Sequence, residues 1–598
     1  MVRASHLAIA VAALAALSAC ATPPTGGPGS TTTASAGPPD ADASIYGLYL
    51  AGQAALDTGD SRSAAELFGK AADKQPNALY LKDRVLTAAL MAGDVQRAAS
   101  LATSASDASQ GDKVLGVLAQ TVEDIADGRG EQAYQRIVKV GDNQPGGSSL
   151  ALLKPWAAAE AGRTEDSVTM PALDDRLTRM VGSIDQGLLL ERARKYPEAE
   201  TTFKALMTDR AGLSLVVAAY GPFLERRGRR QEAVALYDQM LASGPDDPEL
   251  RIARARAASK APPPPEPTIR EGAAQALMVP AAVVLAGKEQ EAGLIYLRLA
   301  LRLDPNQSEA WLLVGDALNS LNDPDGARAA FAQVSPKSGH YVDARTRLAW
   351  SYQNDDKEQA LKIAQDTVQQ RPDSQDAKLT LADLMRADDH FAESARLLDD
   401  VIGRAGDHAE WRLYYMRGVA LERSGQWQGA EADLQKALQM QPTSPEVLNY
   451  LGYSWVNRGT DVQEGLKLIE KALALQPDEG AYVDSLGWAY YRLGDYKKSV
   501  GLLERAATLE AGDAEINDHL GDAYWRAGRH DEARFQWRAV LTMKPPADIK
   551  ARAEIKLDSP DGVDAKADAP QAVAAAAQTS EPQPAASPAP GPSTAGPK

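Results

Sequence analysis

The sequence predicts an all-α protein built as a superhelix of stacked helical hairpins, an α-solenoid. Four glycines recur at intervals of 34, 35 and 34 residues, each within a near copy of one sequence pattern. Within a copy, small and apolar residues recur at i and i+4, which places them on one face of a helix. Proline ends the second predicted helix of most copies, because it cannot continue the helical hydrogen-bond ladder. The glycines are Gly418, Gly452, Gly487 and Gly521, and the prolines are Pro76, Pro245, Pro372, Pro442, Pro477 and Pro545.

The first 20 residues predict export and a lipid anchor. Arg3 and His6 precede an apolar run that is too short to span a bilayer, so residues 1–19 are typical of a signal peptide. The run ends in the tetrapeptide LSAC, which resembles the bacterial lipobox and implies acylation of Cys20, the one cysteine of the chain. The alternative is an ordinary secretory signal with a chance cysteine. Ala21 follows in place of the aspartate of the inner-membrane retention pattern, which implies an outer-membrane anchor that faces the periplasm.

Changes in composition divide the rest of the chain. Residues 20–43 are small, polar and proline-rich, which predicts a disordered tether after the lipidated cysteine. A first repeat array is predicted over 44–258 and a second over 269–557, the second ending in a capping helix. Between them, residues 259–268 contain APPPPEPT, a stiff stretch that cannot form a helix. Residues 558–598 are rich in alanine, proline and serine and are predicted to be a disordered tail.

The charge of the chain restricts its partners. The formal net charge is −17, which argues against nucleic acid and against adhesion to anionic lipid, since both favour a basic surface. Without a cysteine other than Cys20, the mature chain contains no disulfide, and its stability depends on the stacking of repeats. We therefore expect other proteins as partners, with the membrane reached through the lipid anchor.

The repeats resemble the tetratricopeptide repeat family. The resemblance is carried by Leu451, Gly452, Trp455, Ala472 and Pro477 in one copy. A second copy carries Leu520, Gly521, Tyr524, Ala533, Trp537 and Pro545 in the same phase. The resemblance implies paired antiparallel helices whose first members line a concave groove that binds other proteins.

The family's groove positions, transferred by phase, predict a binding surface in the last four repeats. Six of the nine tryptophans lie in this region, and Trp488 and Trp525 fall outside the expected core phase, next to arginine and aspartate, as in a binding hot spot. The alternative is that both tryptophans pack against the adjoining repeat. The predicted groove residues are Tyr415, Arg423, Asn449, Tyr453, Asp484, Trp488, Tyr491, Arg492, Asp522, Trp525 and Arg526.

The order of these parts resembles the outer-membrane tetratricopeptide lipoproteins of Gram-negative bacteria. That resemblance implies a noncatalytic adaptor that brings a periplasmic carboxyl-terminal processing protease together with its substrates, such as cell-wall hydrolases. A structural scaffold for envelope assembly or polysaccharide export is the alternative. An enzyme is a third hypothesis, but the sequence contains no G-x-S-x-G, H-E-x-x-H or phosphate-binding-loop motif. We therefore predict no catalytic residues, no metal site, no cofactor and no small-molecule substrate.

Overall fold

The computed structural model describes residues 43–559, apart from 77, 103–109, 141–146, 172, 174, 209–211 and 244–246. This part of the chain contains 30 α-helices, one short 3-10 helix (η1, Gly406–His408) and no strand, which confirms the all-α prediction. The predictions for the signal peptide, for Cys20, and for nearly all of the tether and the tail lie outside the described residues.

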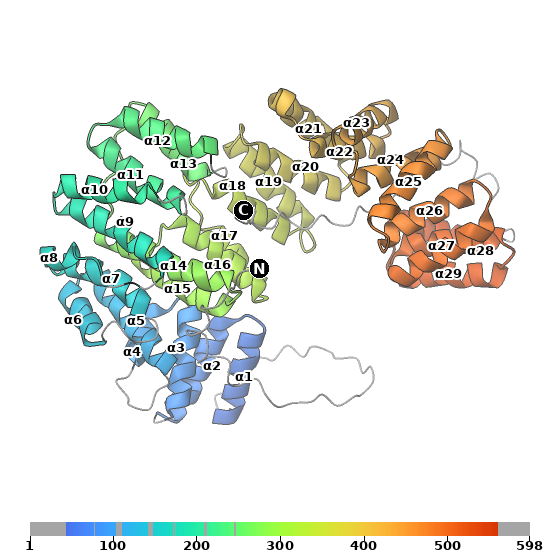
Figure 1. The fold of residues 1–598 in the computed structure, drawn as a ribbon. Helices are drawn as coiled ribbons and strands as arrows, with labels where there is room; N and C mark the ends of the chain where they lie inside the picture. Colours follow the sequence, from blue (N-terminus) through green and yellow to red (C-terminus); the bar gives the residue numbers. More distant parts are fainter. Residues whose placement is uncertain are drawn as a thin grey trace, which may run out of the picture. The chain divides into compact units, whose positions relative to one another are not determined.

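The helices form two compact units, of which the first extends to Ile363 and is called unit 1 (Figure 1). Most of its helices alternate as hairpins in which each helix packs against the next along the chain. Its helices are α1 (Ile45–Asp57), α2 (Ser61–Lys74), α3 (Leu79–Ala92), α4 (Val95–Leu101), α5 (Gln110–Ala126), α6 (Gly130–Val140), α7 (Gly147–Glu160), α8 (Thr164–Ser167), α9 (Arg176–Arg192), α10 (Tyr196–Leu206), α11 (Leu213–Arg226), α12 (Arg230–Ser243), α13 (Pro248–Ala258), α14 (Ile269–Ala286), α15 (Gln290–Leu303), α16 (Ser308–Ser320), α17 (Pro324–Phe331), α18 (Tyr341–Ser351) and the first half of α19 (Lys357–Gln370).

Unit 2 begins at Ala364 and consists of regular helical hairpins. The predicted capping helix is present as α30, which packs against α29 and α28. Its helices after α19 are α20 (Gln375–Ala387), α21 (Phe391–Ala405), α22 (Trp411–Arg423), α23 (Trp427–Met440), α24 (Pro445–Arg458), α25 (Val462–Leu475), α26 (Gly480–Arg492), α27 (Tyr496–Leu509), α28 (Ala514–Arg526), α29 (His530–Thr542) and α30 (Ala547–Asp558).

The spaced glycines allow the two helices of a hairpin to approach closely. A Cβ atom placed on Gly521 would lie 2.4 Å from Nε1 of Trp537, which is fully buried on the second helix of the same repeat. In the repeat before it, a Cβ on Gly487 would lie 2.7 Å from Cγ of Leu503. Both distances are shorter than any ordinary carbon contact, so only glycine fits. The 34-residue period therefore reflects a repeated helix crossing.

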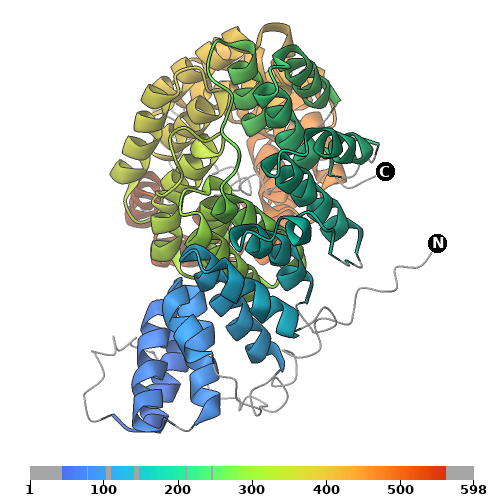
Figure 2. The same cartoon turned by 90° about the vertical axis from the view of Figure 1, so that its left-hand side faces the viewer.

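The boundary between the units differs from the one predicted at the proline-rich segment. Helices α14 and α15, which follow that segment, pack against α3, α5, α7 and α9. Figure 1 labels these helices, and Figure 2 shows the same fold turned by 90°. A Cβ on Gly272 of α14 would lie 2.0 Å from Cη2 of Trp156 on α7. Arg302 of α15 forms an ion pair with Glu123 of α5 at 2.7 Å. The helices on both sides of the proline-rich segment thus share one core, and the chain divides inside α19 instead.

Helix α14 is the one helix of the described chain that is long and apolar enough to cross a membrane by length and composition. Half of that apolar stretch is buried inside unit 1. Its buried face includes Ala273, Ala276 and Leu277, which are inaccessible to solvent. Helix α14 is therefore hydrophobic because it packs in the core of unit 1.

Candidate functional site

Six of the eleven predicted groove residues are buried in the stack of unit 2, with exposures between 3 % and 9 %. The first helices of successive repeats lie against each other, α24 against α26 and α26 against α28, and the neighbouring helix covers these side chains. They therefore present little surface to a partner, in contrast to the prediction that they line an open groove. The six are Asn449, Tyr453, Asp484, Trp488, Tyr491 and Asp522.

Trp488 belongs to this buried packing. Its ring stacks on Tyr491, with 4.6 Å between the ring centroids, and on His519 of the next repeat, at 4.2 Å. Its indole Nε1 donates a hydrogen bond to Oδ1 of Asn457 in the preceding repeat, at 3.3 Å. Trp488 thus contacts the repeat before it and the repeat after it, and only 8 % of it is exposed. This is the alternative stated above, in which the tryptophan packs against the adjoining repeats.

A buried charged pair lies beside Trp488. His519 Nδ1 is 3.0 Å from both carboxylate oxygens of Asp484, and His519 Nε2 is 3.9 Å from Oε1 of Glu515. Burial alone would lower the pKa of His519, but the negative charges of Asp484, Glu515 and Asp518 outweigh that effect and raise the pKa to about 9. The imidazole is therefore positively charged at neutral pH.

The capping helix α30 completes the charge balance of the last repeat. Lys556 Nζ lies 2.8 Å from Asp518 and 2.7 Å from Asp522, and all three side chains are largely buried. Arg552 adds a longer contact of 3.6 Å to Asp518. Two carboxylates buried in one repeat require such cations, since an unpaired buried charge is strongly destabilising. The acidic groove positions of the last repeat are thus neutralised from within the chain.

This cluster is suited to stability more than to catalysis. A histidine with a carboxylate at 3.0 Å has the geometry of a general base and its orienting acid. However, the side chains of His519 and Asp484 are each only 4 % exposed, and aromatic rings cover the histidine. A substrate cannot reach it in this structure. Among the residues that the structure describes, no group of three or more histidine, cysteine, aspartate or glutamate side chains could hold a metal ion.

Five predicted groove residues keep partial exposure: Tyr415, Arg423, Arg492, Trp525 and Arg526. Trp525 stacks on His530 of its own repeat at 4.1 Å and lies under the guanidinium of Arg534 at 5.4 Å. Tyr415 makes an edge contact with Tyr450 at 5.9 Å. Arg526 Nε donates a hydrogen bond to the Tyr491 hydroxyl at 3.4 Å. Side chains of this kind, partly packed and partly exposed, can contact a partner with little loss of conformational freedom.

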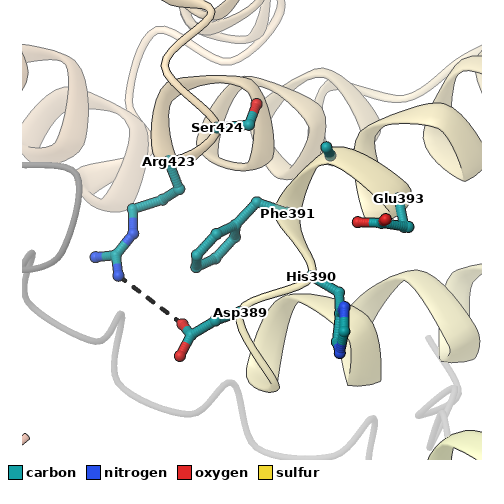
Figure 3. A pocket seen from close by; sticks show the side chains of 7 residues that line it. Asp389, His390, Phe391, Glu393, Arg423 and Ser424 are labelled. Atoms are coloured by element: carbon teal, nitrogen blue, oxygen red, sulfur yellow. Dashed lines mark ion pairs between the residues drawn. The ribbon is translucent and has the colours of Figure 1, made fainter.

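Arg423 lies at a pocket of about 380 Å³ between two successive repeats (Figure 3). Its guanidinium lies over the ring of Phe391 at 4.8 Å and reaches Asp389 at 4.0 Å. The other lining residues are His390, Ala392, Glu393 and Ser424. An aromatic floor beside an arginine and carboxylates suits a peptide that offers both apolar and polar groups.

Sequence reasoning identified only Arg423 of this pocket, because its position after the repeat glycine belongs to the periodic pattern. Asp389, His390 and Phe391 lie in the turn of the preceding repeat and at the start of its second helix, where the pattern specifies no side chain. In a stack of such hairpins, the turn of one repeat lies beside the end of the next repeat's first helix. Applying that rule to the sequence would have identified these three residues.

The fold and this surface define an α-solenoid of helical hairpins with a partly exposed, arginine-containing face. The chain belongs to the tetratricopeptide repeat proteins, and the repeat matches together cover more than half of it. Membership in this family indicates a protein-interaction scaffold. The matches are at residues 49–113, 215–257, 271–341, 343–374, 411–444, 458–514 and 485–548.

Individual proteins match the chain over shorter stretches or at low similarity. The TPR repeat-containing protein PA4667 of Pseudomonas aeruginosa is 38% identical over 82 residues, which is 14% of this chain and 14% of that protein. The chain thus matches far less than two thirds of this relative. The crystal structure of the APC/C hetero-tetramer Cut9-Hcn1 aligns over 86% of this chain and 96% of that chain, at 14% identity and a TM-score of 0.35. Yeast Tom70 aligns over 86% and 95%, at 12% identity and a TM-score of 0.31.

Proposed function

We propose that this protein is a noncatalytic adaptor of the bacterial cell envelope, which holds a periplasmic protease and its protein substrate close together. The repeat array supports this, because a stack of helical hairpins offers an extended surface on which two proteins can bind side by side. The single observation that carries the proposal is the partly exposed face of unit 2, with its pocket at Arg423.

An adaptor increases the rate of a bimolecular reaction without chemistry of its own. Two proteins bound to one array react at an effective concentration that reaches about 1 mM for short separations. The array also restricts the orientation in which the substrate meets the protease. This role requires no catalytic group in the chain itself, because the protease partner would cleave the peptide bond of the substrate.

The proposal includes an anchor at Cys20 in the outer membrane, on the periplasmic side. Its support is the LSAC sequence and the apolar run before it. Three acyl chains would give durable anchoring, at about 0.8 kcal/mol for each buried methylene. A lipid-anchored array would keep both partners at the inner surface of that membrane.

The test is affinity capture of the full chain from detergent-solubilised native membranes, followed by a degradation assay with the recovered proteins. We expect a protease and a second protein that the protease degrades faster when the full chain is present. The substitutions Arg423→Ala and Arg492→Ala together should reduce that acceleration, whereas Arg412→Ala on the same helix as Arg423 should not. Recovery of secretion or assembly components alone, without a protease, would contradict the adaptor and favour the structural scaffold.

A further inference from the structure

The proline-rich segment of unit 1 is bound to the repeats of its own unit by arginine side chains. Residues 262–268 form neither helix nor strand and lie near the ends of α9 and α11. Arg192 Nη1 donates to the carbonyl of Pro267 at 3.3 Å, and Arg226 Nη1 donates to the carbonyls of Pro264 and Pro265 at 3.4 and 3.3 Å. Unit 1 therefore contains a repeat surface with an extended proline-rich chain already bound to it.

The chemistry of this contact explains why proline suits it. A polyproline segment makes no internal hydrogen bonds, so its carbonyl oxygens remain available as acceptors. A guanidinium carries five N–H donors and no acceptor, which matches a chain that offers carbonyls and few N–H groups. The segment is also nearly rigid before it binds, so little conformational entropy is lost. Recognition of this kind depends on backbone carbonyls more than on one particular sequence.

The same arginine position recurs in unit 2. Arg192 and Arg226 stand five residues after the repeat glycines Gly187 and Gly221, at the end of the first helix. Because the repeats share one architecture, an arginine at this position emerges at the same place on each hairpin. In unit 2 the position is held by Arg423 after Gly418, Arg492 after Gly487 and Arg526 after Gly521.

These arginines are available to a ligand to different degrees. Arg226 in unit 1 is fixed by Glu191, with two bonds of 2.9 and 2.6 Å, and still reaches the proline carbonyls. Arg423 has one long ion pair, 4.0 Å to Asp389, and lies over the ring of Phe391 at 4.8 Å, whereas Arg492 forms no ion pair with any residue in the described part of the chain. Phe391 in the pocket beside Arg423 adds an aromatic surface of the type on which proline rings pack. Unit 2 thus has both the donors and an apolar seat.

We propose that this face of unit 2 binds an extended proline-rich segment, and that the segment is the chain's own C-terminal tail, residues 581–598. The tail reads EPQPAASPAPGPSTAGPK and, like APPPPEPT, combines proline at short intervals with few large side chains. Three of the four acidic side chains of residues 560–598 precede this segment, which itself carries Glu581 and Lys598, so its match to the arginine face depends on its backbone carbonyls. The tail would occupy the face that the adaptor proposal assigns to partner proteins, so the inference rests on that site; the docking is nevertheless measured without a partner, and either proposal can fail without the other.

The length of the tail allows this contact. The described chain ends just after α30, where Arg534 Nη1 holds the carbonyl of Leu557 at 3.0 Å, so the tail starts within unit 2. A chain of 39 residues has a maximum reach of roughly 120 Å at about 3.1 Å per residue. The four repeats between the start of the tail and Arg423 occupy about 10 Å for each packed helix layer. The tail can therefore reach back over every arginine of the face.

The docking can be measured in the full chain by energy transfer between two dyes. Cys20→Ser removes the native thiol, and Gln428→Cys and Ser587→Cys supply one label near the pocket and one in the tail. We expect high transfer efficiency that falls by at least half when Arg423→Ala and Arg492→Ala are added. A free peptide of residues 581–598 should lower it as well, at about 1 mM or above, because it competes with a tethered copy at a similar effective concentration.

Two controls separate docking from a change in fold. Arg412→Ala removes an exposed arginine from the same helix as Arg423 and should leave the transfer efficiency unchanged. Replacing the prolines of residues 581–598 by alanine cannot disturb the repeats and should abolish the high transfer. The proposal is overturned if the efficiency is that of an unrestricted 39-residue chain, if the arginine substitutions leave it unchanged, or if the alanine tail docks as well as the native one.

Discussion

Removing the buried positive charge of His519 should destabilise unit 2 in a pH-dependent way. The substitution His519→Gln keeps a side chain of similar size but leaves Asp484, 3.0 Å away, without its cation. Glu515 and Asp518 lie in the same cluster, with Arg552 and Lys556 of α30 facing them. Because Asp484 is 3% exposed, water cannot take over the role of the imidazolium.

The pKa of His519 gives the magnitude and the sign of the effect. Burial opposes protonation, but the surrounding carboxylates raise the pKa from 6.5 to about 9. At about 1.4 kcal/mol per pKa unit, this corresponds to about 3 kcal/mol of stability. A histidine whose folded pKa exceeds its unfolded pKa contributes that stability fully below pH 6.5 and loses it as the pH rises to about 9. The variant should therefore be less stable than the native chain by about 3 kcal/mol at pH 6, and by much less at pH 10.

Urea unfolding at several pH values between 6 and 10 measures this difference. Tryptophan emission is a suitable signal, because Trp488 stacks directly on His519 at 4.2 Å. The matched control is His390→Gln, which should cost little stability because the His390 side chain is about half exposed. An equal loss of stability for His519→Gln at pH 6 and pH 10 would show that the histidine acts through packing alone and would refute the electrostatic argument.

Four further changes test the packing and the anchor. Gly487→Leu should destabilise unit 2 by about 3 kcal/mol or more in urea unfolding, because even its Cβ would lie 2.7 Å from Leu503; an unchanged midpoint would contradict the close helix crossing. Trp488→Ala should cost about 3–5 kcal/mol, as expected for a large buried aromatic, and a native melting temperature would place the ring outside the core. Gly494→Ala should cost about 1 kcal/mol through its φ of 82° alone, since its Cβ would meet nothing within 4 Å. Cys20→Ser should move the protein from the membrane fraction to the soluble fraction, or leave it unprocessed, and retention of a processed form in the membrane would contradict lipidation.

The fold could be predicted from the sequence because a repeat protein is determined by contacts between neighbours. The glycine period alone specifies the crossing of two helices, as the contact between Gly521 and Trp537 shows. The return of α14 and α15 into the first array could not be predicted in this way. It depends on contacts such as Arg302 with Glu123, which are 179 residues apart and follow no period. Long-range pairings of this kind leave no local pattern in one sequence.

The binding surface was predicted less well for a related reason. Helical phase tells on which side of a helix a residue lies, but the exposure of that side depends on how closely the next repeat packs. Trp488 lies on the predicted side and is nevertheless covered by His519 of the following repeat. Arg423 and Arg492, at the last positions of α22 and α26, keep partial exposure.

The proline-rich segment shows how composition and periodicity complement each other. Composition correctly specified its backbone, since four consecutive prolines exclude a helix, but it suggested a strut between two separate arrays. Its contacts are instead determined by Arg192 and Arg226, which occupy one position of the repeat. In an α-solenoid, a contact made by a residue at a repeated position can recur in the other repeats that carry the same residue. Each hairpin that carries this arginine places a guanidinium at the same end of its first helix, although its neighbours differ, so the bound segment of unit 1 indicates a ligand chemistry for Arg423 and Arg492.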